Sequence, residues 1–89
     1  MSAPAQPRIV IYSTRTCSDC VRSKRFLEEH GLSYELHELE AEPELRDVIM
    51  GLNAQLGSQS LTQVPVILID SLVLSEPSND QLAAALGIA

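Results

Sequence analysis

The sequence predicts an α/β fold in which a four-stranded mixed sheet is combined with three helices in the order βαβαββα. Three observations support this: apolar runs of strand length, apolar residues at helical spacing between them, and turn or cap residues at the boundaries. The chain has 89 residues, enough for one domain and too few for two. We expect residues 1–7, which contain two prolines, to form a flexible N-terminal tail, and residues 8–89 to form the domain.

The first half of the domain is predicted to contain a strand, a helix and a second strand. The β-branched run at residues 9–11 predicts a strand that is buried on both faces. A helix starting at Cys17 follows, with Thr16 as its cap and Gly31 just beyond its end. Alternating apolar residues then predict a strand over residues 32–39. Strand, helix and strand in this order imply a right-handed parallel crossover.

The second half is predicted to contain a helix, a hairpin and a last helix. Pro43 opens the helix, because proline is tolerated in a first turn. Residues 64–69 and 72–74 form two apolar strands joined by a two-residue turn. A capping box of Ser78 and Gln81 begins the last helix. The apolar positions that recur at helical spacing after Pro43 are Leu45, Val48, Ile49, Leu52 and Leu56.

Composition argues against several classes of function. The net charge of −6 disfavours a nucleic-acid partner, because phosphate binding needs clustered lysine and arginine. No stretch approaches the roughly 20 apolar residues of a membrane-spanning helix. The first residues lack the basic start and apolar stretch of a secretory signal. We therefore expect a cytoplasmic monomer that binds neither nucleic acid nor membrane.

The two cysteines of the chain, Cys17 and Cys20, lie directly after the first predicted strand, where the first helix begins. In the cytosol such a close pair is more often catalytic or metal-binding than a structural disulfide. Cys17 would lie near unpaired backbone N–H groups and the positive end of the helix dipole, which favour a thiolate. Cys20, one turn on and turned inward, is placed to attack a mixed disulfide at Cys17. The pattern predicts a redox site with Cys17 as nucleophile and Cys20 as resolving cysteine.

Two other interpretations of the cysteine pair stay open. A structural zinc site commonly has four ligands, and the further candidates, His30 and His37, lie well along the chain. Alternatively, the two thiols are partly buried and inert. We expect no bound metal and no bound cofactor.

Four further residues are candidates for substrate binding. Pro65, which follows Val64 at the start of a strand, cannot donate to the sheet, and it leaves neighbouring backbone groups free for a peptide-like substrate. An ordinary loop proline is the alternative. Arg15 is either a partner for a substrate carboxylate or a surface charge. Asp80, in the first turn of the last helix, is also explained by the helix dipole alone.

These residues together resemble the glutaredoxin family, and the closest subgroup is the mycoredoxins. The resemblance covers nearly the whole chain after residue 7. It lies in the Cys-Ser-Asp-Cys sequence at residues 17–20 after a strand, Gln-Val-Pro at residues 63–65 before a hairpin, and the segment 76–80. It implies a thioredoxin fold of the glutaredoxin-like kind and a cis Val64–Pro65 bond. It also implies that the backbone at Val64 pairs with a small thiol whose amino group is contacted by Asp80.

The implied activity is reduction of mixed disulfides between protein cysteines and a low-molecular-weight thiol, with thiolated or oxidised client proteins as partners. The chain departs from the family pattern at three places. Thr14 stands at the usual lysine position, Ser18-Asp19 separates the cysteines, and no glycine pair precedes Asp80. We expect Asp19 to oppose ionisation of the neighbouring thiol. The Ser18-Asp19 pair and the missing glycine pair favour mycothiol over glutathione as the co-substrate.

Two alternative functions follow from the same residues. One is a dithiol electron donor to a reductase such as ribonucleotide reductase, in which Cys17 and Cys20 act together. The other is a metal or iron–sulfur carrier that uses Cys17 as a ligand.

Overall fold

The computed structural model describes residues 7–57 and 63–88. The elements follow the predicted order of strands and helices. They are β1 (Ile9–Ser13), α1 (Ser18–Glu29), β2 (Glu35–Glu38), α2 (Leu45–Gln55), β3 (Val66–Ile69), β4 (Leu72–Ser75) and α3 (Asn79–Leu86). The expected N-terminal tail remains a prediction, because residues 1–6 lie outside the described part of the chain. Among the described residues, no helix is long and apolar enough to cross a membrane.

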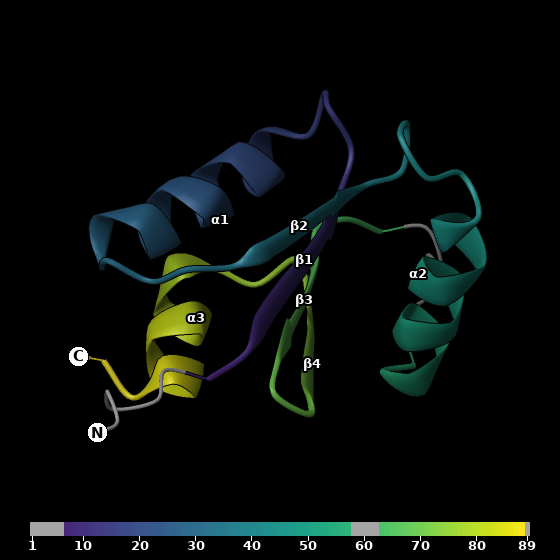
Figure 1. The fold of residues 1–89 in the computed structure, drawn as a ribbon. Coiled ribbons are helices and arrows are strands. Elements are labelled where there is room, and N and C mark those ends of the chain that lie inside the picture. Colours follow the sequence, from purple (N-terminus) through teal and green to yellow (C-terminus); the bar gives the residue numbers. More distant parts are fainter. Residues whose placement is uncertain (1–6, 58–62, 89) are drawn as a thin grey trace, which may run out of the picture.

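The four strands form one mixed sheet in the order β2-β1-β3-β4. The central strand β1 pairs in parallel with β2 and antiparallel with β3. β3 and β4 form the predicted antiparallel hairpin. Helices α1 and α3 cover one face of the sheet and α2 covers the other (Figure 1). The predicted four-stranded mixed sheet with three helices is therefore confirmed.

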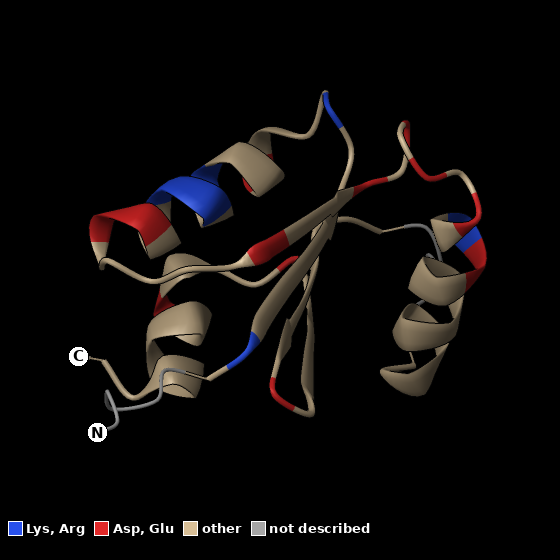
Figure 2. Cartoon of the chain, in the orientation of Figure 1, with Lys and Arg blue, Asp and Glu red and all other residues tan. Residues whose placement is uncertain are grey.

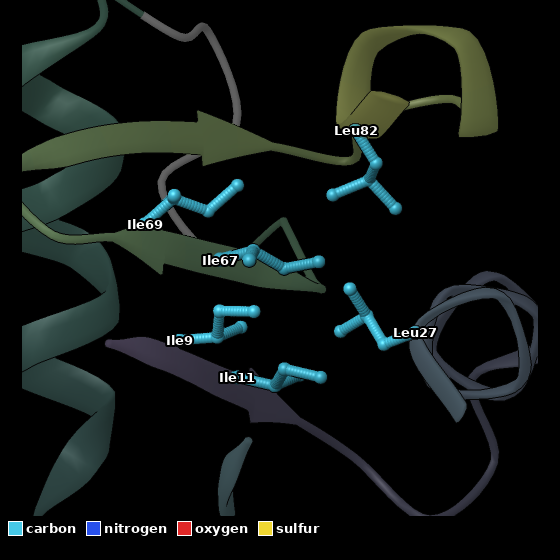
Figure 3. Packing of buried hydrophobic residues seen from close by; sticks show 6 residues of the cluster. All are labelled: Ile9, Ile11, Leu27, Ile67, Ile69 and Leu82. Atoms are coloured by element: carbon cyan, nitrogen blue, oxygen red, sulfur yellow. The ribbon is translucent and has the colours of Figure 1, made fainter. Parts of the chain in front are cut away.

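The main hydrophobic cluster lies between the sheet and the helices α1 and α3 (Figure 3). Alternate residues of β1 and β3 project to this side, because successive side chains of a strand point to opposite faces. Leu27 of α1 and Leu82 of α3 meet them from the helices. The six buried members are Ile9, Ile11, Leu27, Ile67, Ile69 and Leu82. Their burial supplies much of the apolar area that stabilises the domain.

Helix α2 packs on the opposite face with a narrower buried surface. Its buried residues are Ile49 and Asn53. Two members of the predicted apolar series are exposed: Val48 by 42% and Leu56 by 45%. The spacing predicted the helix correctly, but only Ile49 and Asn53 of the helix are fully buried.

Several element boundaries differ from the prediction for local reasons. Cys17, and not Thr16, caps α1, and its own sulfur accepts the hydrogen bond of the helix's first turn. The strand predicted over residues 32–39 is reduced to β2, an edge strand. Leu32 and Tyr34, which precede β2, pack instead against the hydrophobic cluster.

Helix α2 begins at Leu45 and not at Pro43, and β3 begins at Val66 and not at Val64, whereas the predicted end of α1 and start of α3 are confirmed. Gly31 follows the end of α1 with φ of 69°, a left-handed conformation that glycine adopts without strain. The capping box of α3 has both of its hydrogen bonds. The Ser78 hydroxyl accepts from the Gln81 N–H at 3.1 Å, and the Gln81 side chain accepts from the Ser78 N–H at 2.8 Å.

Candidate active site

The Cys17 sulfur lies at the N-terminus of α1, between the helix and the segment before β3. It accepts a hydrogen bond from the Cys20 N–H at 3.1 Å. Its thiol also donates toward the Val64 carbonyl oxygen at 3.7 Å. Cys17 is half-buried and its thiol is not joined in a disulfide. A helix N-terminus stabilises negative charge, so the site can hold the sulfur as a nucleophile.

The Cys20 sulfur lies deeper, and its side chain is fully buried. The pKa of the Cys20 thiol is raised from 9.0 to about 12. Burial is the main cause, and a hydrogen bond with the Cys17 sulfur is the second. The nearby Thr14 backbone and the Lys24 charge act in the opposite direction but are the weaker influences. Cys20 therefore keeps its proton at neutral pH. The different exposure expected for the two cysteines is confirmed.

The Val64–Pro65 peptide bond is cis, as the family resemblance implied. The carbonyl groups on either side of Val64 are both engaged. Asn53 Nδ2 donates to the Gln63 oxygen at 3.0 Å, and the Glu76 N–H donates to the Pro65 oxygen at 2.8 Å. Among the described residues, no hydrogen bond is formed by the Val64 N–H. The structure thus brings Cys17, Cys20, Val64 and Pro65 together.

Arg15 lies in the loop between β1 and α1, with its side chain exposed. Its backbone N–H donates to both carboxylate oxygens of Glu40, at 3.2 and 3.1 Å. This hydrogen bond is the main reason that the pKa of the Glu40 carboxyl lies below its usual range. Glu40 belongs to the acidic turn between β2 and α2, which Figure 2 shows beside this loop. The sequence did not suggest that Glu40 anchors the cysteine loop.

Arg22 of α1 is half-buried and reaches across to the segment that begins α3. Its guanidinium donates to Asn79 Oδ1 at 2.7 Å and to the Pro77 carbonyl at 3.0 Å. It also lies 3.6 Å from the carboxylate of Asp19. The negative charge of Asp19 therefore has a cation beside it.

Two hollows lie near these residues. The larger, of about 430 Å³, is at the N-terminus of α3 and is lined by Arg22, Glu76, Ser78, Asn79, Asp80 and Gln81. The smaller, of about 260 Å³, lies between α2 and the segment before β3, and it is lined by Leu39, Arg46, Ile49 and Val64. Arg46 is a candidate substrate-binding residue that the sequence analysis did not single out. It lines the same hollow as Val64 because α2 packs against the sheet.

Among the described residues, no hydrogen bond or ion pair joins Arg15 or Asp80 to Cys17. No group of three or more His, Cys, Asp or Glu residues in that part of the chain could hold a metal ion.

The model of the family described as glutaredoxin matches residues 9–73, which carry the cysteine pair, the Val64–Pro65 segment and the hairpin. The chain belongs to the glutaredoxin family. Membership implies a thiol–disulfide oxidoreductase, a class that acts on protein disulfides and small thiols. No curated protein sequence was found to match the chain.

Solved structures of the glutaredoxin family share this fold. The glutaredoxin-like NrdH-redoxin of Escherichia coli is 30% identical with a TM-score of 0.69, over 86% of this chain and 92% of that one. A glutaredoxin of Archaeoglobus fulgidus is 22% identical with a TM-score of 0.69, over 88% and 84%. The dithiolic glutaredoxin 2-C-Grx1 of Trypanosoma brucei brucei is 20% identical with a TM-score of 0.70, over 91% and 80%. The predicted thioredoxin-like fold is confirmed.

Proposed function

We propose that this glutaredoxin-family protein reduces mixed disulfides between client proteins and a low-molecular-weight thiol, with mycothiol as the preferred thiol, in the manner of a mycoredoxin. Cys17 is the nucleophile. The observation that carries the proposal is the position of its sulfur, half-buried at the start of α1 and facing the Val64 backbone. In this proposal the protein acts as a cytoplasmic monomer without a bound cofactor.

The proposed reaction has two thiol–disulfide exchanges. The Cys17 thiolate attacks the sulfur of the small thiol, which breaks the mixed disulfide and releases the client cysteine as a thiol after protonation. Cys17 is then joined to the small thiol. A second molecule of the thiol, as thiolate, attacks the sulfur of the first. This step regenerates the Cys17 thiolate and releases the oxidised dimer of the small thiol, so the two electrons come from two small-thiol molecules.

The state of Cys20 supports this one-cysteine route. Its thiol is fully buried, with a pKa raised to about 12 by burial and by the Cys17 sulfur. A free small thiol has no such barrier to ionisation. It can therefore finish the cycle without Cys20 losing its proton.

The larger hollow supports mycothiol as the preferred thiol. Every residue that lines it carries a side chain able to form hydrogen bonds. Mycothiol is a cysteine derivative of a hydroxyl-rich pseudodisaccharide, and sugar hydroxyls need many such partners. In this proposal Asp80 and Glu76 accept from sugar hydroxyls, while Arg46 and Arg15 lie on the client side of the cysteine.

The proposal is tested with one model protein carrying either mycothiol or glutathione on the same cysteine. We expect kcat/KM about tenfold higher for the mycothiol adduct, the ratio that about 1.4 kcal/mol of extra transition-state binding produces. Asp80→Ala should reduce this preference and leave the rate of Cys17 alkylation unchanged. An equal or higher kcat/KM with glutathione would contradict the thiol preference. Turnover of neither adduct would contradict the function itself.

A second candidate is a dithiol donor to a reductase such as ribonucleotide reductase. The likeness to NrdH-redoxin favours it, because that protein is described as having a thioredoxin-like activity profile. In this route Cys17 attacks a client disulfide, and Cys20 then attacks the Cys17 sulfur to release the client. The protein is left with a Cys17–Cys20 disulfide, which two electrons from a flavoprotein reductase would reopen. Rapid turnover of a protein disulfide in the absence of any small thiol would support this route.

A further inference from the structure

We propose that Asn53, on the face of α2 that meets the sheet, is a positioning residue that holds the Val64 backbone opposite the Cys17 sulfur. This inference rests on the proposed function, in which the substrate disulfide is held between Cys17 and that backbone. Asn53 is fully buried although its amide is polar. A buried amide destabilises a protein unless its donors and acceptors are satisfied, so its hydrogen bonds indicate what it does.

The Asn53 amide joins three segments that lie far apart in the sequence. Its Nδ2 donates to the Gln63 carbonyl oxygen at 3.0 Å, immediately before Val64. Its Oδ1 accepts from the Ser75 hydroxyl at 2.7 Å, at the end of β4. The Ser75 hydroxyl also lies 3.5 Å from the Gln63 side-chain oxygen. A single side chain therefore ties α2 to β4 and to the segment that faces Cys17.

The network continues on the other side of Val64. The Gln63 side-chain amide donates to Glu76 Oε1 at 2.7 Å. The Glu76 N–H in turn donates to the Pro65 carbonyl at 2.8 Å. With the flanking carbonyls of Gln63 and Pro65 both fixed, the peptide groups of Val64 have little freedom to rotate away from Cys17. Glu76 also lines the larger hollow. The same network therefore connects the Val64 backbone with this hollow, the two places where the substrate is proposed to bind.

Packing alone does not account for an asparagine at this position. Ile49, one turn earlier on α2, is buried on the same face and is aliphatic. Another aliphatic residue at position 53 would bury more apolar surface without the cost of a polar group. What asparagine adds is a donor and an acceptor on one short, rigid side chain. The donor faces the Gln63 carbonyl, which is the contact that acts on Val64.

Asn53→Asp is the sharpest test, because it keeps the size and the acceptor facing Ser75 but loses the donor to the Gln63 oxygen. For the protein–mycothiol mixed disulfide we expect KM to rise about tenfold, the effect of one lost buried hydrogen bond, and kcat to change little. The rate of Cys17 alkylation by iodoacetamide should stay at the wild-type value, since this reagent needs no contact with Val64. Asn53→Ala, which introduces no charge, should raise KM similarly. Ser75→Ala should have a smaller effect.

Ile69→Ala is the matched control, because Ile69 is buried at the far end of β3 and takes no part in the network. It should lower the melting temperature and leave KM unchanged. A wild-type KM in both Asn53 variants would overturn the positioning role and leave the proposed function intact. An equal rise of KM in Ile69→Ala would also overturn it, by reducing it to general destabilisation. If the wild-type protein failed to reduce the mixed disulfide, the proposed function would fall, and this inference with it.

Discussion

Between the sheet and helices α1 and α3, the main cluster consists of six aliphatic side chains (Figure 3). Between the sheet and α2, the helix contributes one isoleucine and one asparagine to the buried surface. The first arrangement is non-directional, because apolar contacts depend on area and close packing. The second includes hydrogen bonds, which fix the orientation of the groups that they join. We infer that one face mainly stabilises the domain, and that the other mainly places the Val64 backbone beside Cys17.

This comparison explains why α2 has exposed apolar residues. A helix whose main task was burial would be expected to bury the whole of its apolar series. Val48 in α2 and Leu56 at its C-terminal cap remain exposed, while the polar Asn53 is buried. Helix α2 lies where the side-chain amide of Asn53 reaches the segment before β3.

The largest expected effect is on stability at the aliphatic face. Leu27→Ala should lower the free energy of unfolding by about 2–5 kcal/mol, because it removes a buried side chain and leaves a cavity. KM for the mixed disulfide should stay at the wild-type value. Urea denaturation and steady-state kinetics on the same preparation measure both. Val21→Ala on the exposed side of the same helix is the control, with an expected change of less than about 0.5 kcal/mol. The division of roles between the faces would be wrong if Leu27→Ala raised KM as strongly as Asn53→Ala.

The next effect is a dependence of stability on pH, which arises because the Cys20 thiol is buried where α1 meets the sheet. Its pKa is about 12 in the folded protein against 9.0 as the ordinary value. Between these values the unfolded chain binds fewer protons than the folded one, so stability falls as pH rises. The slope should approach about 1.4 kcal/mol per pH unit above pH 9.

Cys20→Ser isolates this contribution, because it removes the thiol from both the folded and the unfolded state. Denaturant titrations of both proteins between pH 8 and about 11 report the difference in slope. Parallel stability curves for the two proteins over this range would mean that Cys20 ionises as easily in the folded protein as in the unfolded chain. The chemical reason for preferring the one-cysteine route would then be lost.

The smallest effect lies at the start of α3, where a local cap supports the aliphatic face. Ser78→Ala removes the acceptor for the Gln81 N–H and should cost about 1 kcal/mol of stability. Thermal unfolding monitored by circular dichroism measures it. Ser71→Ala, in the turn between β3 and β4, is the control. A loss no greater than that of Ser71→Ala would show that the capping box contributes little to the position of α3.

Much of the fold could be predicted from sequence because its signals are local. The β-branched run predicted β1, the glycine at position 31 predicted the end of α1, and Ser78 with Gln81 predicted the start of α3. The cysteine pair was found for the same reason, since its spacing and its place after a strand are visible in a few residues. The difference in burial between Cys17 and Cys20 also follows from helical geometry.

The rest of the site depends on partners that are distant in sequence. The contact of Arg22 could not be read from the sequence, because Asn79 lies 57 residues away. Asn53 was overlooked because its partners, Gln63 and Ser75, lie 10 and 22 residues away. Neither residue type signals a buried role by itself. Only the packing of α2 and α3 against the sheet brings these groups into contact.

The central claim is that Cys17 completes the reaction with small thiols and without Cys20. The most direct test is turnover of a protein–mycothiol mixed disulfide by Cys17→Ser and by Cys20→Ser, with mycothiol in excess. Cys20→Ser should keep most of the wild-type activity, because the free thiol takes the place of the buried one. Cys17→Ser should have none. If Cys20→Ser is inactive at every mycothiol concentration, and equally inactive with other thiols, the one-cysteine route is contradicted and the dithiol route replaces it.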